Sequence, residues 1–269
     1  MKDKEKLIRY FEASGSGEEA RRMLDLAEQV VAGKPAEHEP FEPYRVTEFM
    51  SPAGLVIADA IKANLPQLKV EFGGGYEGAE RIRVAFVESD FQGNVDLGIK
   101  ALKVSWDPRF RLLTHRDVLG SLMGLGIERT NFGDIIMQTG GAQLIVDAAM
   151  ADYVKQNFTK IAMVSVSVED MDISEIQPKE EKIKEIRTTV ASLRLDAVAS
   201  SGFSVSRTKV VSSINAGLVQ VNWQPAKGPA QEVKEGDIIS LRGRGRMKIE
   251  EITGTSRKGR IGVYLKRFM

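Results

Sequence analysis

The chain has no cysteine and only two histidines, His38 and His115. The lack of cysteine excludes a disulfide scaffold, a Cys-ligated zinc site, an iron–sulfur cluster and a thiol nucleophile. Two histidines are too few for a multi-histidine metal centre, so no cofactor is expected, although a mixed carboxylate site stays open. No segment approaches the ~18 consecutive apolar residues of a membrane span, and residues 1–13 lack the apolar stretch of a signal peptide. These absences fit a cytoplasmic protein.

Negative charge outweighs positive charge in the first two thirds of the chain, and positive charge is in excess in the last third. From Arg187 to the end there are 15 Lys and Arg against 6 Asp and Glu, a net charge of +9, while residues 1–186 carry a net charge of −8. A basic module on an acidic body is typical of a protein that binds a polyanion. The acidic body would limit indiscriminate binding and leave one basic face to select the target.

Hydrophobic periodicity divides the chain into three parts and indicates an α+β protein. Residues 1–75 are expected to form a helical N-terminal domain. Residues 76–173 mix helices with short strands, which predicts a central ferredoxin-like α/β sandwich. The charge-dense segment 174–187 is interpreted as the connection to a C-terminal domain, 187–269. The expected helices cover 4–32, 52–65, 115–125 and 149–158, and the expected strands cover 68–72, 82–88, 99–106, 134–138, 142–148 and 161–168.

The C-terminal domain contains clear start and stop signals for local structure. Ser206 is a suitable N-cap for a helix that buries Val210 and Ile214, and Gly217 is a suitable residue for its left-handed end. The run 218–223 then alternates like a strand.

Two basic clusters in this domain suit an anionic ligand. Arg207 and Lys209 lie in the first turns of the helix after Ser206, where free backbone amides favour phosphate. Arg242, Arg244 and Arg246 alternate with glycines, so a continued strand would send all three exposed guanidinium groups to one face. The alternative interpretation is a solvated edge strand that charge protects from aggregation.

The order RLD (194–196), SR (206–207), AGLVQVN (216–222) and EGD (235–237) resembles the RNA-binding domain named after ribosomal protein S4. That domain grips structured RNA with two helices and a small curved sheet. The chain departs from the pattern at Trp223, where the family has glycine and the turn is expected to be rebuilt, and at Ser213, which is expected to loosen the core. The resemblance predicts an RNA-binding set of Arg194, Ser204, Ser206, Arg207, Lys209, Lys227, Arg242, Arg244, Arg246 and Lys248.

Nearly the whole chain is similar to the YlmH family, also called RqcP. The resemblance is carried by the segments GGYEGAER (74–81), HRDVLGSLMGLGIER (115–129), GDI (133–135), VNW (221–223) and RGRGRMKI (242–249). It implies binding to ribosomal RNA of dissociated large subunits that still hold peptidyl-tRNA. It also implies help in the alanine tailing of stalled nascent chains, with a tailing factor of the RqcH type as partner, and a link to cell division.

Three segments are similar to catalytic motifs without completing them. FGGGYEG (72–78) lacks the Walker pattern and is interpreted as a flexible turn between domains. His115-Arg116-Asp117 is similar to a kinase catalytic loop, but position 122 is Leu, and a helix start with Thr114 as N-cap explains it. Asp196 stands in the sequence context of a pseudouridine synthase aspartate, but only 73 residues follow it. It is therefore expected to start a helix and pair with arginine.

The sequence thus favours a non-catalytic RNA-binding factor of the ribosome, because it contains no recognisable nucleophile–base pair or catalytic carboxylate pair. Two alternatives stay open. One is an RNA-modifying enzyme with a catalytic central domain, and the other is a scaffold protein in cell division.

Overall fold

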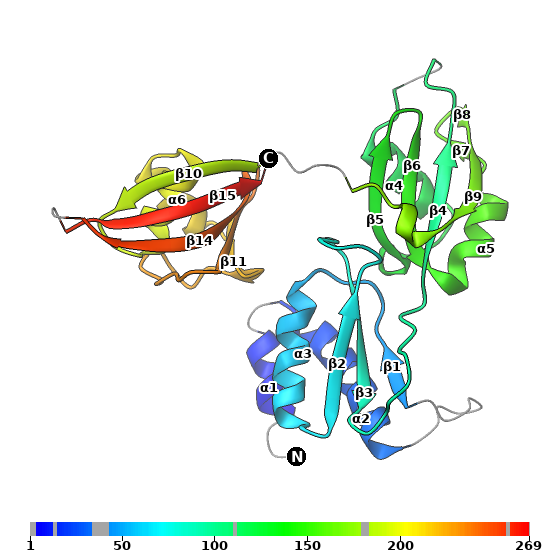
Figure 1. The fold of residues 1–269 in the computed structure, drawn as a ribbon, viewed down its shortest axis with the longest axis horizontal. Helices are drawn as coiled ribbons and strands as arrows, with labels where there is room; N and C mark the ends of the chain where they lie inside the picture. Colours follow the sequence, from blue (N-terminus) through cyan, green and yellow to red (C-terminus); the bar gives the residue numbers. More distant parts are fainter. Residues whose placement is uncertain are drawn as a thin grey trace. The chain divides into compact units, whose positions relative to one another are not determined.

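The structure is a computed structural model that describes residues 4–12, 15–33, 43–109, 112–178, 183–256 and 259–268. It has two compact units, Met1–Lys179 and Glu180–Met269 (Figure 1). His38 lies outside the described residues. None of the helices in the described ranges is both long enough and apolar enough to cross a membrane.

The first unit begins with three helices packed on a small antiparallel sheet of order β1-β3-β2. Phe11, Leu24, Ile57 and Phe86 are fully or almost fully buried between the helices and the sheet. The helices expected over 4–32 and after Pro52 are confirmed. The elements are α1 (Lys4–Glu12), α2 (Gly17–Ala32), β1 (Tyr44–Val46), α3 (Ala53–Asn64), β2 (Leu68–Gly73) and β3 (Arg83–Glu88).

The strand expected over 82–88 was assigned to the central sandwich, and this assignment is wrong. β3 pairs with β2 from Leu68↔Glu88 to Gly73↔Arg83 and with β1 on its other side. Strand partners depend on backbone hydrogen bonds between segments distant in sequence, and side-chain alternation does not reveal them. The domain boundary expected after residue 75 stays a prediction.

The central part of the first unit has the element order βαββαβ and an antiparallel sheet of order β5-β6-β4-β9. This is the ferredoxin-like arrangement, so that prediction is confirmed. Thr139 and Gly140 form the hairpin turn between the second and third strands of this part, since Gln138 pairs with Gly141. The elements are β4 (Ile99–Ser105), α4 (His115–Met123), η1 (Arg129–Asn131), β5 (Phe132–Gln138), β6 (Gly141–Asp147), α5 (Ala148–Asn157), β7 (Lys160–Ile161), β8 (Val164–Ser165), β9 (Ser167–Met171) and η2 (Ile173–Glu175).

The triplet His115-Arg116-Asp117 is the start of α4. Thr114 accepts a hydrogen bond from the backbone amide of Asp117, and the Asp117 carboxylate accepts one from the Thr114 amide at 2.9 Å, which forms a capping box. The helix-start interpretation of this motif is therefore confirmed.

The central sheet is covered on both faces. Leu144 packs in the core shared with α4 and α5, whereas its neighbour Ile145 points to the opposite face. There Ile145 and Ala101 pack with Phe49 from the N-terminal part of this unit and with Ile176, which follows η2. The N-terminal part therefore buries a portion of the sheet face that a bare ferredoxin-like sandwich would leave to solvent.

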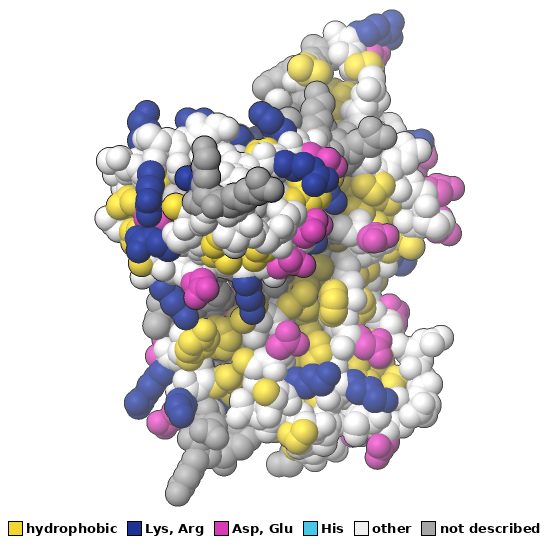
Figure 2. Space-filling view, turned by 60° about the vertical axis from the view of Figure 1, so that its left-hand side comes forward, with side chains coloured by type: hydrophobic (Ala, Val, Ile, Leu, Met, Phe, Trp, Pro, Cys, Tyr) yellow, Lys and Arg dark blue, Asp and Glu magenta, His cyan; other side chains and the backbone are white. Residues whose placement is uncertain are grey.

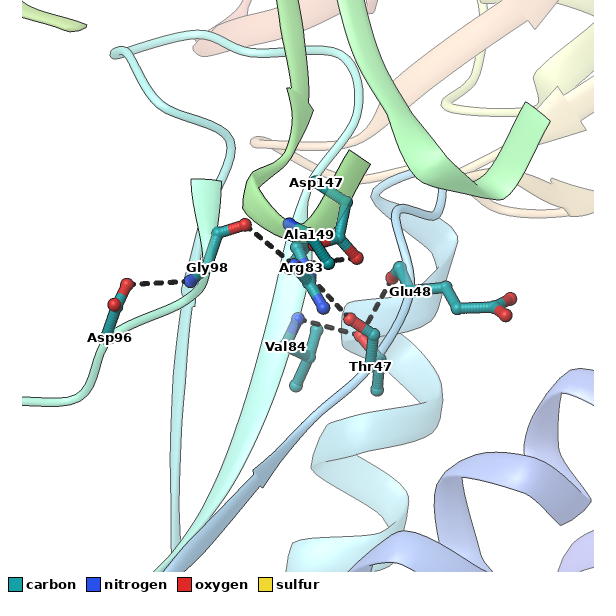
Figure 3. A network of polar contacts seen from close by, with 8 residues as sticks. All are labelled: Thr47, Glu48, Arg83, Val84, Asp96, Gly98, Asp147 and Ala149. Atoms are coloured by element: carbon teal, nitrogen blue, oxygen red, sulfur yellow. Dashed lines mark hydrogen bonds and ion pairs between the residues drawn. The ribbon is translucent and has the colours of Figure 1, made fainter. Parts of the chain in front are cut away.

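Arg83 connects the two parts of this unit (Figure 3). Its guanidinium donates to the carbonyl of Thr47 at 2.7 Å and to the carbonyl of Gly98 at 2.9 Å, and it lies 3.3 Å from the Asp147 carboxylate. It also lies 5.6 Å from the centre of the Phe49 ring. Only 11% of the Arg83 side chain is exposed, so these contacts replace its hydration.

The glycine-rich segment is anchored at the same junction. Gly74 is buried, and a Cβ at this position would approach the Arg81 carbonyl oxygen to 2.3 Å. Asp134 accepts from the Tyr76 hydroxyl at 2.8 Å and from the Glu80 amide at 2.7 Å. The interpretation of this segment as a flexible turn is thus wrong, because long-range polar contacts and a close backbone approach fix it.

Two arginines complete the junction. Arg81 donates to the carbonyls of Phe132 at 2.9 Å and Phe49 at 2.6 Å, while Arg129 donates to Phe132 at 2.6 Å. Burial, together with the nearby positive charge of Arg81, lowers the pKa of Arg129 to about 10 against the opposing effect of Asp134. The segment 74–81 therefore binds residues 129–134.

The second unit is a six-stranded antiparallel sheet of order β10-β15-β14-β13-β11-β12, with two helices on one face (Figure 1). Leu195, Val198, Phe203, Met247 and Leu265 are buried between the helices and the sheet. The elements are β10 (Ile183–Val190), α6 (Leu195–Phe203), α7 (Arg207–Asn215), β11 (Val219–Val221), β12 (Gln224–Pro225), β13 (Ile238–Leu241), β14 (Gly245–Thr255) and β15 (Ile261–Phe268). The connection expected over 174–187 is a strand from Ile183 onward, because β10 pairs with β15.

In the turn between β11 and β12, Trp223 stands where the S4-type family has glycine, yet the backbone keeps the left-handed conformation that glycine favours. Asn222 and Trp223 have φ values of 50° and 61°, as a two-residue type I′ hairpin requires. The left-handed region costs a non-glycine residue ~1–2 kcal/mol. Asn222 offsets this cost, since its side chain donates to Asp237 at 2.9 Å and accepts from the Ile238 amide at 2.9 Å.

We predict that Arg83→Leu lowers the free energy of unfolding of the first unit by about 3 kcal/mol, because it leaves two carbonyls and a partly buried carboxylate without their donor. Urea unfolding followed by Trp106 fluorescence in a Trp223→Phe background reports this unit alone, since these are the two tryptophans of the chain. Arg109→Leu is the control, because its side chain is 87% exposed. Equal midpoints for the two variants would contradict the bridging role of Arg83.

Candidate nucleic-acid interface

Asp196 is the organising residue of the helical face of the second unit. It lies in the first turn of α6 with only 3% of its surface exposed. Its carboxylate accepts from Arg194 at 3.3 and 3.1 Å and from Arg207 at 3.0 Å to each oxygen. The expectation that Asp196 starts a helix and pairs with arginine is confirmed.

The charge of Asp196 is maintained against its burial. Burial by itself raises the pKa of the carboxyl, but hydrogen bonds from Arg194 and Arg207 and their positive charges outweigh it and hold the pKa below its ordinary value. The carboxylate is therefore ionised at neutral pH. It neutralises part of the charge of both guanidinium groups and fixes their positions.

Arg207 is exposed, and it is also ion-paired with Asp196. Its side chain is 53% exposed and that of Arg194 is 43% exposed. A guanidinium has five N–H donors, and the carboxylate occupies only part of them. The two arginines retain donors toward solvent in a fixed orientation.

The turn between α6 and α7 presents short polar side chains. Ser204 ends α6 in the left-handed region at φ 55°, and its amide donates to the Ser200 carbonyl. Ser206 caps α7, and its hydroxyl accepts from the Lys209 amide at 3.4 Å. Ser206 as N-cap and Gly217, with φ 70°, as the left-handed residue after α7 are both confirmed.

The three arginines at 242–246 do not share one strand face, and that expectation is wrong. β13 ends at Leu241 and β14 begins at Gly245, so Arg242 and Arg244 lie in the turn between them. Gly243 and Gly245 have φ values of 80° and 86°. These positive φ angles interrupt the pleat on which the period-two prediction depended.

Arg267, which the sequence analysis missed, holds this turn beside the helices. Its guanidinium donates to the Phe203 carbonyl at 3.3 Å and to the Arg244 carbonyl at 3.2 Å, and it stacks 5.5 Å from the centre of the Phe203 ring. Phe203 is the last residue of α6, so the turn with Arg242 and Arg244 lies next to the α6–α7 turn. No sequence signal marks Arg267, because its partners are backbone carbonyls.

The expected RNA-binding residues fall into separate groups on the second unit. The helical face carries Arg194, Ser204, Ser206, Arg207 and Lys209, with Arg242 and Arg244 beside it. By contrast, Arg246 and Lys248 alternate on β14 with the buried Met247 and Ile249 and therefore point away from the helices. Lys227 is exposed in the loop after β12, where its amide donates to Gln231 at 2.7 Å. Figure 2, which brings this unit forward, likewise shows Lys and Arg side chains at several separate places.

Comparison with known proteins finds a matching protein family in each of the two units. Residues 93–175 match the family described as "Putative RNA-binding domain in YlmH", and residues 193–239 match the S4 domain. The Ribosome-associated protein quality control protein P2 of Bacillus subtilis (strain 168) is 37% identical over 229 residues, which cover 84% of this chain and 89% of that protein.

The chain belongs to the YlmH family. Both the family resemblance and the S4-type domain expected from the sequence are thereby confirmed. A solved YlmH structure, the cell division protein ylmH from Streptococcus pneumoniae, is 26% identical with a TM-score of 0.44, and the match covers 58% of this chain and 93% of that one. The S4 match ends at residue 239, so all of β14 and all of β15 lie beyond it.

We predict that Asp196→Asn lowers the free energy of unfolding of the second unit by about 2 kcal/mol at pH 7. Because the folded pKa is depressed below the unfolded value of about 3.9, the carboxylate stabilises the fold above that pH. This contribution is lost as the pH falls through the folded pKa. The difference in melting temperature between wild type and variant should therefore shrink below about pH 4.

The control for this measurement is Glu251→Gln at an exposed position, which should change stability by less than about 0.5 kcal/mol. A destabilisation by Asp196→Asn that is as large at pH 2.5 as at pH 7 would show that the carboxylate's charge is not what stabilises α6 and α7.

Proposed function

We propose that this protein is a ribosome-associated RNA-binding factor that grips structured RNA of the large subunit beside peptidyl-tRNA. We further propose that it assists the tailing of stalled nascent chains together with a tailing factor of the RqcH type. The name of the Bacillus subtilis relative supports an activity in ribosome-associated quality control. The two matched domains support RNA as the ligand.

The observation that carries the proposal is the rigid basic surface around the α6–α7 turn. Asp196 orients Arg194 and Arg207, and Arg267 ties the turn with Arg242 and Arg244 to the end of α6. Arginines held in advance lose less conformational freedom when they pair with phosphate, and their planar fork pairs with two oxygens at once. This arrangement suits the closely spaced phosphates of folded RNA.

Each expected residue has a proposed role at this surface. Arg207 and Lys209 flank the N-terminus of α7, where the helix dipole adds to their attraction for phosphate. The hydroxyls of Ser204 and Ser206 are proposed to contact the RNA backbone. Lys227 is proposed to make a peripheral phosphate contact. Arg246 and Lys248 point away from this surface and need a separate explanation.

We propose an adaptor rather than an enzyme. Arg194 and Arg207 of the helical face are ion-paired with Asp196, and the motif at 115–117 starts a helix. Such groups bind and orient a polyanion. The experiment for this part is incubation of the purified protein with ribosomal RNA and group donors, where a modification abolished by one carboxylate substitution would contradict the adaptor role.

We predict that Arg242→Ala together with Arg244→Ala weakens binding to large ribosomal subunits by about tenfold to a hundredfold, as expected for two lost phosphate contacts. The slope of log affinity against log salt should fall by about 1.5 units. Co-sedimentation at several potassium concentrations measures both quantities. The turn is exposed, so the melting temperature should stay within about 2 °C of wild type.

Arg9→Ala together with Arg22→Ala is the matched control, since it removes the same charge from exposed positions of the first unit that lie outside the matched segment 93–175. This control should bind like wild type. If the turn variant melts normally and still co-sediments like the control, then the RNA surface is elsewhere.

A further inference from the structure

The second unit has an outer sheet face that the S4-type surface does not use. Along β15, Val263 and Leu265 are buried against the helices, so Tyr264, Lys266 and Phe268 point to the other side. Figure 1 shows β10, β15 and β14 side by side, with α6 behind them. Nearly all of this face is formed by strands outside the matched S4 segment.

Two arginine–aromatic pairs stand on this face. Arg187 of β10 is the cross-strand neighbour of Tyr264, and its guanidinium carbon lies 4.4 Å from the centre of the Tyr264 ring. Arg246 of β14 is the neighbour of Phe268, at 5.3 Å from the ring centre. The rings are four residues apart on one strand, which corresponds to roughly 13 Å, with Lys266 between them. Each guanidinium stacked on a ring offers its outer plane to a further flat group.

The charge on this face is modest. Arg187, Arg246, Lys248 and Lys266 share this face with Glu185, Glu250 and Glu251, the last of which is the cross-strand partner of Tyr264. Glu250 lies 3.0 Å from the Lys248 amine and 3.8 Å from the Lys266 amine. A hydrogen bond from the Tyr264 hydroxyl to Glu185, together with burial, raises the pKa of that tyrosine, so it stays a neutral donor. With three carboxylates among four cations, stacking rather than charge density is the distinguishing property.

We propose that the outer face of β10, β15 and β14 is a second RNA-binding surface, which takes unpaired bases on the Arg187–Tyr264 and Arg246–Phe268 stacks. Lys266 and Lys248 contact the phosphates between these bases. Interleaved aromatic and basic side chains on a sheet are the chemistry that binds single-stranded RNA, because every base has a face that can stack. This inference rests on the proposed function only for RNA as the ligand class. It also assigns a role to Arg246 and Lys248.

The test uses the full chain with two RNAs, a fluorescein-labelled 12-residue oligoadenylate and a fully paired hairpin. Arg187→Gln together with Arg246→Gln should weaken oligoadenylate binding at least tenfold in fluorescence anisotropy, with hairpin binding unchanged. Arg187→Lys together with Arg246→Lys keeps the positive charges but removes the planar guanidinium groups. This variant should restore less than half of the loss in log affinity for oligoadenylate that the glutamine variant shows. The melting temperature of each variant is measured alongside. If the double variants melt at a lower temperature than wild type, the single variant Arg187→Lys at an exposed position is tested instead.

The variant with alanine at 242 and 244 separates this inference from the proposed function. It should lose hairpin binding and keep oligoadenylate binding. If the outer-face variants bind oligoadenylate like wild type, the second surface does not exist, even where the 242/244 variant still fails on hairpins and ribosomal subunits. Full recovery by lysine would overturn the stacking mechanism. A changed hydrodynamic radius with unchanged oligoadenylate affinity would mean that the face docks on the protein itself, which also overturns the proposal.

Discussion

The helical face of the second unit depends on one buried carboxylate. Removing Asp196 from water costs several kcal/mol unless opposite charges and hydrogen bonds replace its hydration. Arg194 and Arg207 supply both, and they approach from the residue before α6 and from the first residue of α7. The same contact therefore fixes the starts of two helices and orients two guanidinium groups. The proposed RNA surface is built here around a buried anion.

Arginine performs a similar structural task elsewhere in the chain. Arg83 and Arg81 join the two parts of the first unit through backbone carbonyls, and Arg267 joins a hairpin turn to the end of α6. In each case a planar group with several donors satisfies carbonyls from different segments at once. A count of basic residues therefore overstates the charge available to a ligand, since several guanidinium groups are committed to the fold.

The structural contacts of these basic side chains affect how the net charge of the second unit is interpreted. The arginines at positions 194 and 207 are partly neutralised, and Lys248 and Lys266 share Glu250. Arg242 and Arg244 extend into solvent from a turn, where they can pair with phosphate. The unit then has two chemically distinct faces. One is helical and rich in fixed guanidinium groups, and the other is a sheet with stacked aromatic rings.

The sequence by itself determined the local structure and the family. Helix caps such as Thr114, Ser206 and Gly217, the alternation of the central strands and the asymmetry of charge follow from neighbouring residues, whose interactions are short in range. Only the tertiary structure decided which strands pair and which side chains meet. β3 pairs within the N-terminal sheet, and glycines at positive φ separate Arg242 and Arg244 from the strand that carries Arg246. Arg187 contacts Tyr264, which lies 77 positions further along the sequence. These outcomes depend on contacts between distant segments, which hydrophobic periodicity along the chain does not encode.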